Sequence, residues 1–243
     1  MWLFAIGFLF IIGPGEAFLN NLGTVIKTLY PPSLDYLGHP TTAATHVSIV
    51  GITSTVARLL TGSLTDLLAP SPPAQHVQIT SSSPTLRRLS FSVSRVAFLL
   101  GFAVLLAAGL AVLASGFTQN HGDRFWVVSG LVGAGYGAVF SLTPIIITVI
   151  WGVENFATNW GIVAMFPAVG ATVWGLIYSA VYQAGTRRPD APVQGGEDDN
   201  LCYGTQCYAA TFWAMSVSVL LACGLVVMAW RGKNGWVQRG IVI

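Results

Sequence analysis

The chain has 243 residues, of which 53% are hydrophobic and only 8% are charged. With so little charge, a soluble domain could not cover its surface with polar groups, so the composition excludes an ordinary soluble protein. The net charge is only +2 and no block of basic residues is present, which gives no indication of nucleic-acid binding.

Six long apolar stretches account for most of the chain, and nearly every charged residue lies between them. A helix needs about 20 mostly apolar residues to cross a bilayer, and the stretches lack the alternating polarity of membrane β-strands. We therefore predict an all-α polytopic membrane protein that forms one domain over residues 1–243. The spanning helices are expected at about residues 2–26, 42–68, 93–117, 125–151, 158–182 and 208–230.

The first predicted span contains a carboxylate next to a helix-weakening segment. Residues 13–15 (Gly-Pro-Gly) precede Glu16, and a proline inside a helix removes a backbone donor. A carboxylate in the bilayer core costs about 2.5–3.5 kcal/mol, so Glu16 is expected to face other helices or water. Asn20, Gly23 and Lys27 share its helical face, and Thr24 lies beside them. Two interpretations stay open: Glu16, Asn20, Asn21 and Lys27 line a solute or proton path, or Glu16 locks its helix to a neighbour.

The second predicted span carries two charged residues. Arg58, Gly62 and Asp66 are spaced four apart after Ser54, which predicts one shared helical face. Arg58 and Asp66 are too far apart for a direct pair on one straight helix. Each is expected to pair with another helix, or Arg58 extends toward the headgroups. His46 is interpreted as a histidine between helices, because no second ligand is suitably spaced for a metal.

Glycine is concentrated in the fourth predicted span, where residues 130–137 include four glycines. Small residues let helices pack closely in lipid, so helix packing is the main prediction, with bending at Pro144 as a second. No strand precedes these glycines, which excludes a nucleotide-binding loop. The sequence also lacks the common hydrolase and zinc-protease motifs, so we expect neither an enzyme nor a cofactor nor a metal.

The polar connections predict the orientation. Arg87 and Arg88 precede the third span, and basic residues also follow the last span, so both segments are expected on the cytoplasmic side. This orientation puts Cys202 and Cys207, which share one polar loop, on the opposite side, where a disulfide persists. The alternative is a pair of free thiols.

Several segments of the chain resemble a known transporter family. The residues from Gly62 to Asp66 resemble the Gly-x-x-x-Asp loop motif of the major facilitator superfamily. Longer matches resemble the fungal monocarboxylate-transporter-homologue, nodulin-like branch of that superfamily. They cover residues 13–24 (GPGEAFLNNLGT), 57–62 (ARLLTG), 151–161 (WGVENFATNWG) and 202–208 (CYGTQCY).

The resemblance implies two bundles of six helices and transport of a small solute through alternating access. The name of the family suggests a monocarboxylate as this solute. This chain would be the C-terminal bundle, located in the vacuole or another endomembrane, with an N-terminal half or a second copy as its partner. Glu16, Asn20 and Asn21 would face the central cavity, and Arg58 and Asp66 would belong to a cytoplasmic gate. The alternative is a truncated product or a membrane scaffold that transports nothing.

Overall fold

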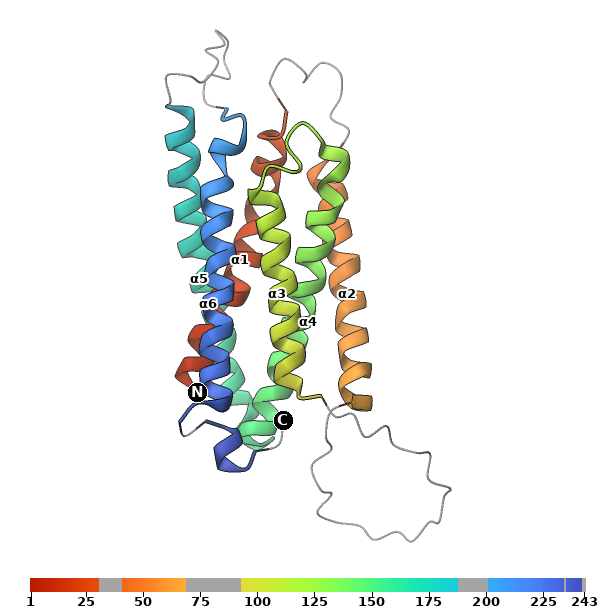
Figure 1. The fold of residues 1–243 in the computed structure, drawn as a ribbon, viewed down its shortest axis with the longest axis vertical. Helices are drawn as coiled ribbons and strands as arrows, with labels where there is room; N and C mark the ends of the chain where they lie inside the picture. Colours follow the sequence, from red (N-terminus) through yellow and green to blue (C-terminus); the bar gives the residue numbers. More distant parts are fainter. Residues whose placement is uncertain (31–40, 69–92, 188–200, 234, 242–243) are drawn as a thin grey trace.

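The computed structural model describes residues 1–30, 41–68, 93–187, 201–233 and 235–241, and it contains six long α-helices (Figure 1). They are α1 (Trp2–Lys27), α2 (Ala43–Leu68), α3 (Arg95–Ala114), α4 (Phe125–Trp151), α5 (Phe156–Thr186) and α6 (Ala209–Arg231). All six are long and apolar enough to cross a membrane, and the described ranges contain no strand. The prediction of an all-α protein with six membrane-spanning helices is therefore confirmed. Two bounds differ from the expected ones, since α3 is shorter and α5 continues beyond residue 182.

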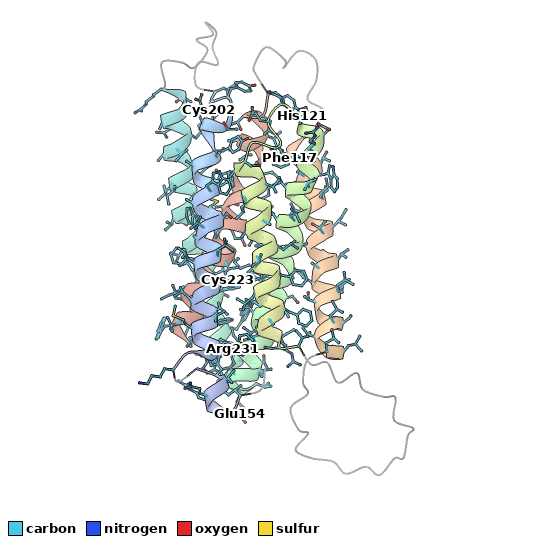
Figure 2. All side chains as sticks on the ribbon, in the orientation of Figure 1. Phe117, His121, Glu154, Cys202, Cys223 and Arg231 are labelled. Carbon is cyan, nitrogen blue, oxygen red and sulfur yellow. A yellow bond between two sulfur atoms is a disulfide. The ribbon has the colours of Figure 1, made fainter. Side chains whose placement is uncertain are left out.

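The helices alternate in direction, which gives the bundle two distinct ends (Figure 1). The tail end contains the start of α1, the ends of α2, α4 and α6, and the short 3-10 helix η4 (Val237–Arg239). The cap end contains the end of α1 and the 3-10 helices η2 (Gly122–Arg124) and η3 (Thr205–Cys207). Figure 2 shows Arg231 at the tail end and Cys202 at the cap end. Arg87 and Arg88, on which the predicted orientation depends, lie outside the described residues.

The contacts between helices follow one continuous series. α2 packs on α4, α4 on α3, α3 on α6, α6 on α1, and α1 on α5. α2 and α5 stand at the two ends of this series, and only a few residues of each are buried. The bundle consequently has an inner group of four helices and two edge helices whose outward surfaces have few partners within the described chain.

The glycines of α4 bring their helix close to both neighbours. A Cβ atom on Gly133 would lie 2.9 Å from the carbonyl oxygen of Val50 in α2. A Cβ atom on Gly135 would lie 2.7 Å from the carbonyl oxygen of Phe102 in α3. Neither position has room for a larger side chain, so this glycine run packs α4 between two helices, as its composition predicts.

The Gly-Pro-Gly segment of α1, which the sequence predicts to weaken or break the helix, lies inside a continuous helix. α1 continues from Trp2 to Lys27, and neighbours hold the segment on both sides. A Cβ atom on Gly13 would lie 2.8 Å from the Cα atom of Gly170 in α5, and one on Gly15 would lie 2.8 Å from the Tyr136 ring of α4. These close contacts stabilise a helical path that the segment alone would disfavour.

A set of polar contacts, which we call the polar cap, closes the cap end. The amide of Gln119 donates to the carbonyl oxygens of Thr28 and Leu29, and its own oxygen accepts from the Tyr208 hydroxyl at 3.1 Å. The backbone N–H of Gly204 also donates to the Thr28 carbonyl at 3.0 Å. The loops after α1 and α3 and the loop before α6 are thereby joined.

A disulfide reinforces the same end. Cys202 and Cys207 are joined, with their Cα atoms 5.8 Å apart, and both are buried. The backbone N–H of Cys202 donates to the Tyr182 hydroxyl at 3.1 Å, which attaches the loop to α5. Gly185 of α5 faces the Cys202 sulfur and leaves no room for a Cβ atom.

Candidate functional site on the open side of α1, α2 and α4

Glu16 is bonded to another helix at the middle depth of the bundle. It stands 14 residues after the start of α1, or about 21 Å along the helix axis from the tail end. Its side chain is half-buried, and its Oε1 atom accepts a hydrogen bond of 2.5 Å from the Tyr136 hydroxyl of α4. A short bond between a hydroxyl and a carboxylate is among the stronger hydrogen bonds in proteins.

Arg58 of α2 lies near this pair, against a neighbouring ring of α4. Its guanidinium carbon is 5.4 Å from the centre of the Phe140 ring, which is a cation–π distance. Phe140 follows Tyr136 by one turn, and the two rings are 5.9 Å apart. Arg58 stands 10 residues before the end of α2, or about 15 Å from the tail end, so it lies roughly one turn below Glu16.

Both charges therefore contact aromatic rings of one helix. Glu16 contacts the phenol of Tyr136, and Arg58 contacts the ring of Phe140. Arg58 is exposed and makes no ion pair with any residue that the structure describes. A guanidinium stacked on a ring keeps its N–H donors available at its edge, so it can receive a planar anion.

Further rings form the wall behind this cluster. The Phe140 ring lies 6.0 Å from Phe8 of α1 and 5.8 Å from Trp160 of α5. The Trp160 ring is stacked on Phe156. The wall thus connects α1, α4 and α5 and holds Phe140 in place beneath Arg58.

The other polar residues of α1 form an exposed stripe toward the cap end. Asn20 and Lys27 are both exposed. Asn21 is half-buried, and its amide donates to the Ala17 carbonyl of its own helix at 2.8 Å. The Tyr178 hydroxyl of α5 donates to Thr24 at 3.1 Å. Asn20 and Asn21 therefore lie between the α4 contact of Glu16 and the α5 contact of Thr24, and Lys27 lies beyond both at the end of α1.

The predicted polar face of α2 is divided in the structure. Ser54 is buried against Gly137 of α4, whereas Arg58 and Asp66 are exposed. Residues four apart are rotated by about 40° in an α-helix, so the direction drifts by about 120° over three such steps. The expectation of one shared face is therefore wrong. The buried face consists of His46, Val50, Ser54, Ala57, Thr61 and Thr65, in which one step of three residues after Ser54 corrects the drift of the steps of four.

Gly62 and Asp66 lie away from the charged cluster, in the last two turns of α2 at the tail end. Asp66 is exposed, and a Cβ atom on Gly62 would meet nothing within 4 Å. Arg58 is about 12 Å from Asp66 along the helix axis. The structure thus places Arg58 beside Phe140 and not with Asp66.

His46 occupies the interface between α2 and α4. Its Nδ1 atom is 3.0 Å from the Ser129 hydroxyl, and its Nε2 atom contacts the Thr41 hydroxyl. Its ring stands edge-on to Phe125, with the centres 4.7 Å apart. Both nitrogens are thus occupied by hydroxyl groups, and the described part of the chain contains no group of three metal-ligating side chains.

Sequence reasoning did not identify Tyr136 and Phe140. Both lie in α4, and Tyr136 stands between two glycines of a run that was interpreted as a packing and bending segment. The one available signal is the phenol inside the glycine run, since a polar group at that depth needs a hydrogen-bond partner.

These features define an integral membrane protein with two opposite charges at mid-depth. One accepts a hydrogen bond from a phenol, and the other is stacked on an aromatic ring. The chain is similar over its full length to the probable transporter mch1 of Neurospora crassa, with 75% identity over 243 residues. It is also 59% identical over 244 residues to the probable transporter MCH1 of Gibberella zeae. A more distant relative, the probable transporter MCH1 of Saccharomyces cerevisiae, is 26% identical and matches 96% of the chain.

The comparisons confirm the resemblance to fungal transporter homologues that the sequence motifs indicate. The chain spans about two fifths of the length of these curated relatives, from 40% to 42%. No protein-family model matches the chain, and no solved structure matches it.

Proposed function

We propose that this chain is the C-terminal six-helix half of a major-facilitator transporter that moves a small solute by alternating access. The relatives that cover the whole chain are named probable transporters, and the chain spans 40% of the Neurospora crassa relative, about one half of a two-bundle transporter. The partner is then an N-terminal six-helix half, or a second copy of this bundle. It would cover the surface of α1, α2 and α4 on which Glu16 is half-buried and Arg58 is exposed.

The charged cluster at mid-depth carries this proposal. A charge in the bilayer core costs about 2.5–3.5 kcal/mol, and such residues are retained mainly where they face a path or a partner. Glu16 and Arg58 both lie at this depth, on the side of α4 that the described chain leaves uncovered.

The chemistry of the cluster favours a monocarboxylate as the solute. The guanidinium of Arg58 can bind a carboxylate through two parallel N–H donors. Glu16 repels a second anion near the same place, so the solute approaches from the Arg58 side. Asn20 and Lys27 would line the path toward the cap end, while Gly62 and Asp66 would form part of a gate at the tail end.

We propose that the tail end is cytoplasmic and that the membrane is vacuolar or another endomembrane. The tail carries Arg231, Lys233 and Arg239, and basic residues near helix ends favour the cytoplasmic side. The buried disulfide would then lie on the lumenal side, where it can persist.

Uptake of radiolabelled monocarboxylates into vesicles that contain the full-length transporter tests the proposal. Arg58→Gln is expected to lower uptake roughly tenfold or more, since a hydrogen bond to a charged group contributes about 1.5–3 kcal/mol. Tyr136→Phe and Glu16→Gln should lower uptake as well, because the first removes the donor of their bond and the second removes the negative charge of its acceptor. Glu154→Gln, at the exposed connection between α4 and α5, is the matched control.

Unchanged uptake in Arg58→Gln and Glu16→Gln would remove the cluster from the transport path. If the parent protein also moves no solute in any orientation, the chain would be a membrane scaffold or a truncated product. Folding of each variant is checked by its melting temperature in detergent.

A further inference from the structure

A cavity of about 310 Å³ opens at the tail end, far from the charged cluster. The ends of α1, α4 and α6 form its walls, and the tail that follows α6 forms its rim. Trp2, Leu3 and Met228 contribute apolar surface, and Lys233 and Arg239 contribute positive charge. None of the described residues that line the cavity is acidic.

The described residues of the rim are hydrogen-bonded to one another. The backbone N–H of Gly235 donates to the Gly232 carbonyl at 2.7 Å, and a Cβ atom on Gly235 would lie 2.8 Å from that same oxygen. The tight turn therefore requires glycine at position 235. It directs Trp236 back toward the bundle and fixes the backbone that carries Lys233 and Arg239.

Trp236 anchors this rim. Its side chain is only 5% exposed. Its ring meets Phe4 of α1 edge-on at 5.5 Å and Trp151 of α4 edge-on at 6.2 Å. The backbone N–H of Trp236 also donates to the Ala229 carbonyl of α6 at 3.1 Å. The two basic residues thus stand on a segment that is attached to three helices.

Tryptophans indicate the depth of this cavity in the membrane. Trp2 begins α1, Trp151 ends α4, and Trp230 precedes the last residue of α6. Tryptophan concentrates at the membrane–water boundary, so these three positions place the cavity at the level of the lipid headgroups. Arg231 lies 4.4 Å from the Trp230 ring centre and adds positive charge at the same level.

The apolar side of the cavity faces outward at the same depth. Trp2 is 65% exposed, Leu3 48% and Met228 55%, although all three are apolar. Such exposure is stable only against another apolar surface, which at this depth is a lipid chain or a protein partner. The positive charge at the rim matches the headgroup of an anionic phospholipid, and the apolar surface of the helices matches its acyl chains.

We propose that this cavity binds one anionic phospholipid. The phosphate lies between Lys233 and Arg239, and the first part of an acyl chain lies on Leu3 and Met228. Basic pockets at helix ends are sites where acidic headgroups bind, and each cation near such a surface strengthens the attraction. The bound lipid fastens the tail to the ends of α1 and α6.

Native mass spectrometry of the full-length transporter tests this site. The protein is titrated with phosphatidylserine and, separately, with phosphatidylcholine. We expect one phosphatidylserine molecule to bind more tightly than phosphatidylcholine. Lys233→Gln combined with Arg239→Gln should weaken that event roughly tenfold or more. Arg124→Gln combined with Arg187→Gln, which removes two exposed cations at the cap end, is the matched control and should leave it unchanged.

Two further arms separate the alternatives. Lys233→Arg keeps the charge and should retain phosphatidylserine, while Met228→Asp should weaken it through the apolar side. Displacement of the lipid by inorganic phosphate alone would identify a site for soluble anions and overturn the lipid assignment. Equal phosphatidylserine affinity in the parent and the double glutamine variant would also overturn it. These readouts do not depend on uptake, so they stand apart from the proposed transport.

Discussion

The two ends of the bundle are closed by different kinds of interaction. At the cap end, Gln119 and Tyr208 form hydrogen bonds that reach backbone carbonyls of the loop after α1, and a disulfide joins Cys202 to Cys207. At the tail end, one ring, Trp236, is buried between Phe4 and Trp151. The first closure is polar and spread over three loops, whereas the second is apolar and depends on one side chain.

The two ends should therefore respond differently to substitution. A single hydrogen bond contributes only about 0.5–1.5 kcal/mol net, so loss of one leaves the others in place. Burial of a tryptophan contributes several times more through one residue, so the tail depends on that residue. The cap should therefore weaken gradually, and the tail should detach in a single step.

Trp236→Ala should have the largest effect. Truncation of a buried tryptophan costs about 3–5 kcal/mol in protein cores. Because the tail can detach locally, most of this cost should appear as faster trypsin cleavage after Lys233 and Arg239, with a smaller change in global melting temperature. Trp213→Ala is the matched control, since Trp213 is 48% exposed on α6. Equal cleavage of the two variants would show that the ring does not hold the tail.

Gln119→Leu should have an intermediate effect at the opposite end. The substitution removes two donated bonds and one accepted bond, but the Thr28 and Leu29 carbonyls each keep a backbone partner. We expect a loss of about 1–3 kcal/mol in the free energy of unfolding. Denaturation in detergent measures it, with Gln183→Leu on the exposed end of α5 as the control. A loss as large as that of Trp236→Ala would contradict the gradual response of the cap.

Sequence reasoning predicts the helices well and the contacts between them poorly. Length and hydropathy are enough to locate six spans, and the cost of a buried carboxylate is enough to single out Glu16. Its partner Tyr136 lies 120 residues away, and which faces of α1 and α4 meet depends on glycine contacts in three dimensions. Trp236 could be taken for an ordinary interface aromatic, because its burial depends on the turn before it.

The α2 face shows the same limit in a different form. A repeat of four residues was expected to keep Ser54, Arg58 and Asp66 together, but the helix rotates enough to separate them. Short repeats are reliable over one or two turns. Over a whole span, the burial of each position depends on the packing of the helix in three dimensions. In the structure, Arg58 lies beside the Phe140 ring, whereas Asp66 is exposed at the end of α2.

The smallest expected effect is a pH dependence of the polar cap. Burial raises the pKa of Tyr208 to about 12, above its ordinary value of 10. The neutral phenol is therefore favoured in the folded state, and stability that is fully present below pH 10 should be lost as the pH rises toward 12. Tyr208→Phe should flatten this decline of the melting temperature. Gln119→Leu is the control, since it removes the same hydrogen bond but keeps the phenol, and its decline should stay steep. If the two variants decline alike, the hydrogen bond and not the ionisation of Tyr208 controls the cap at high pH.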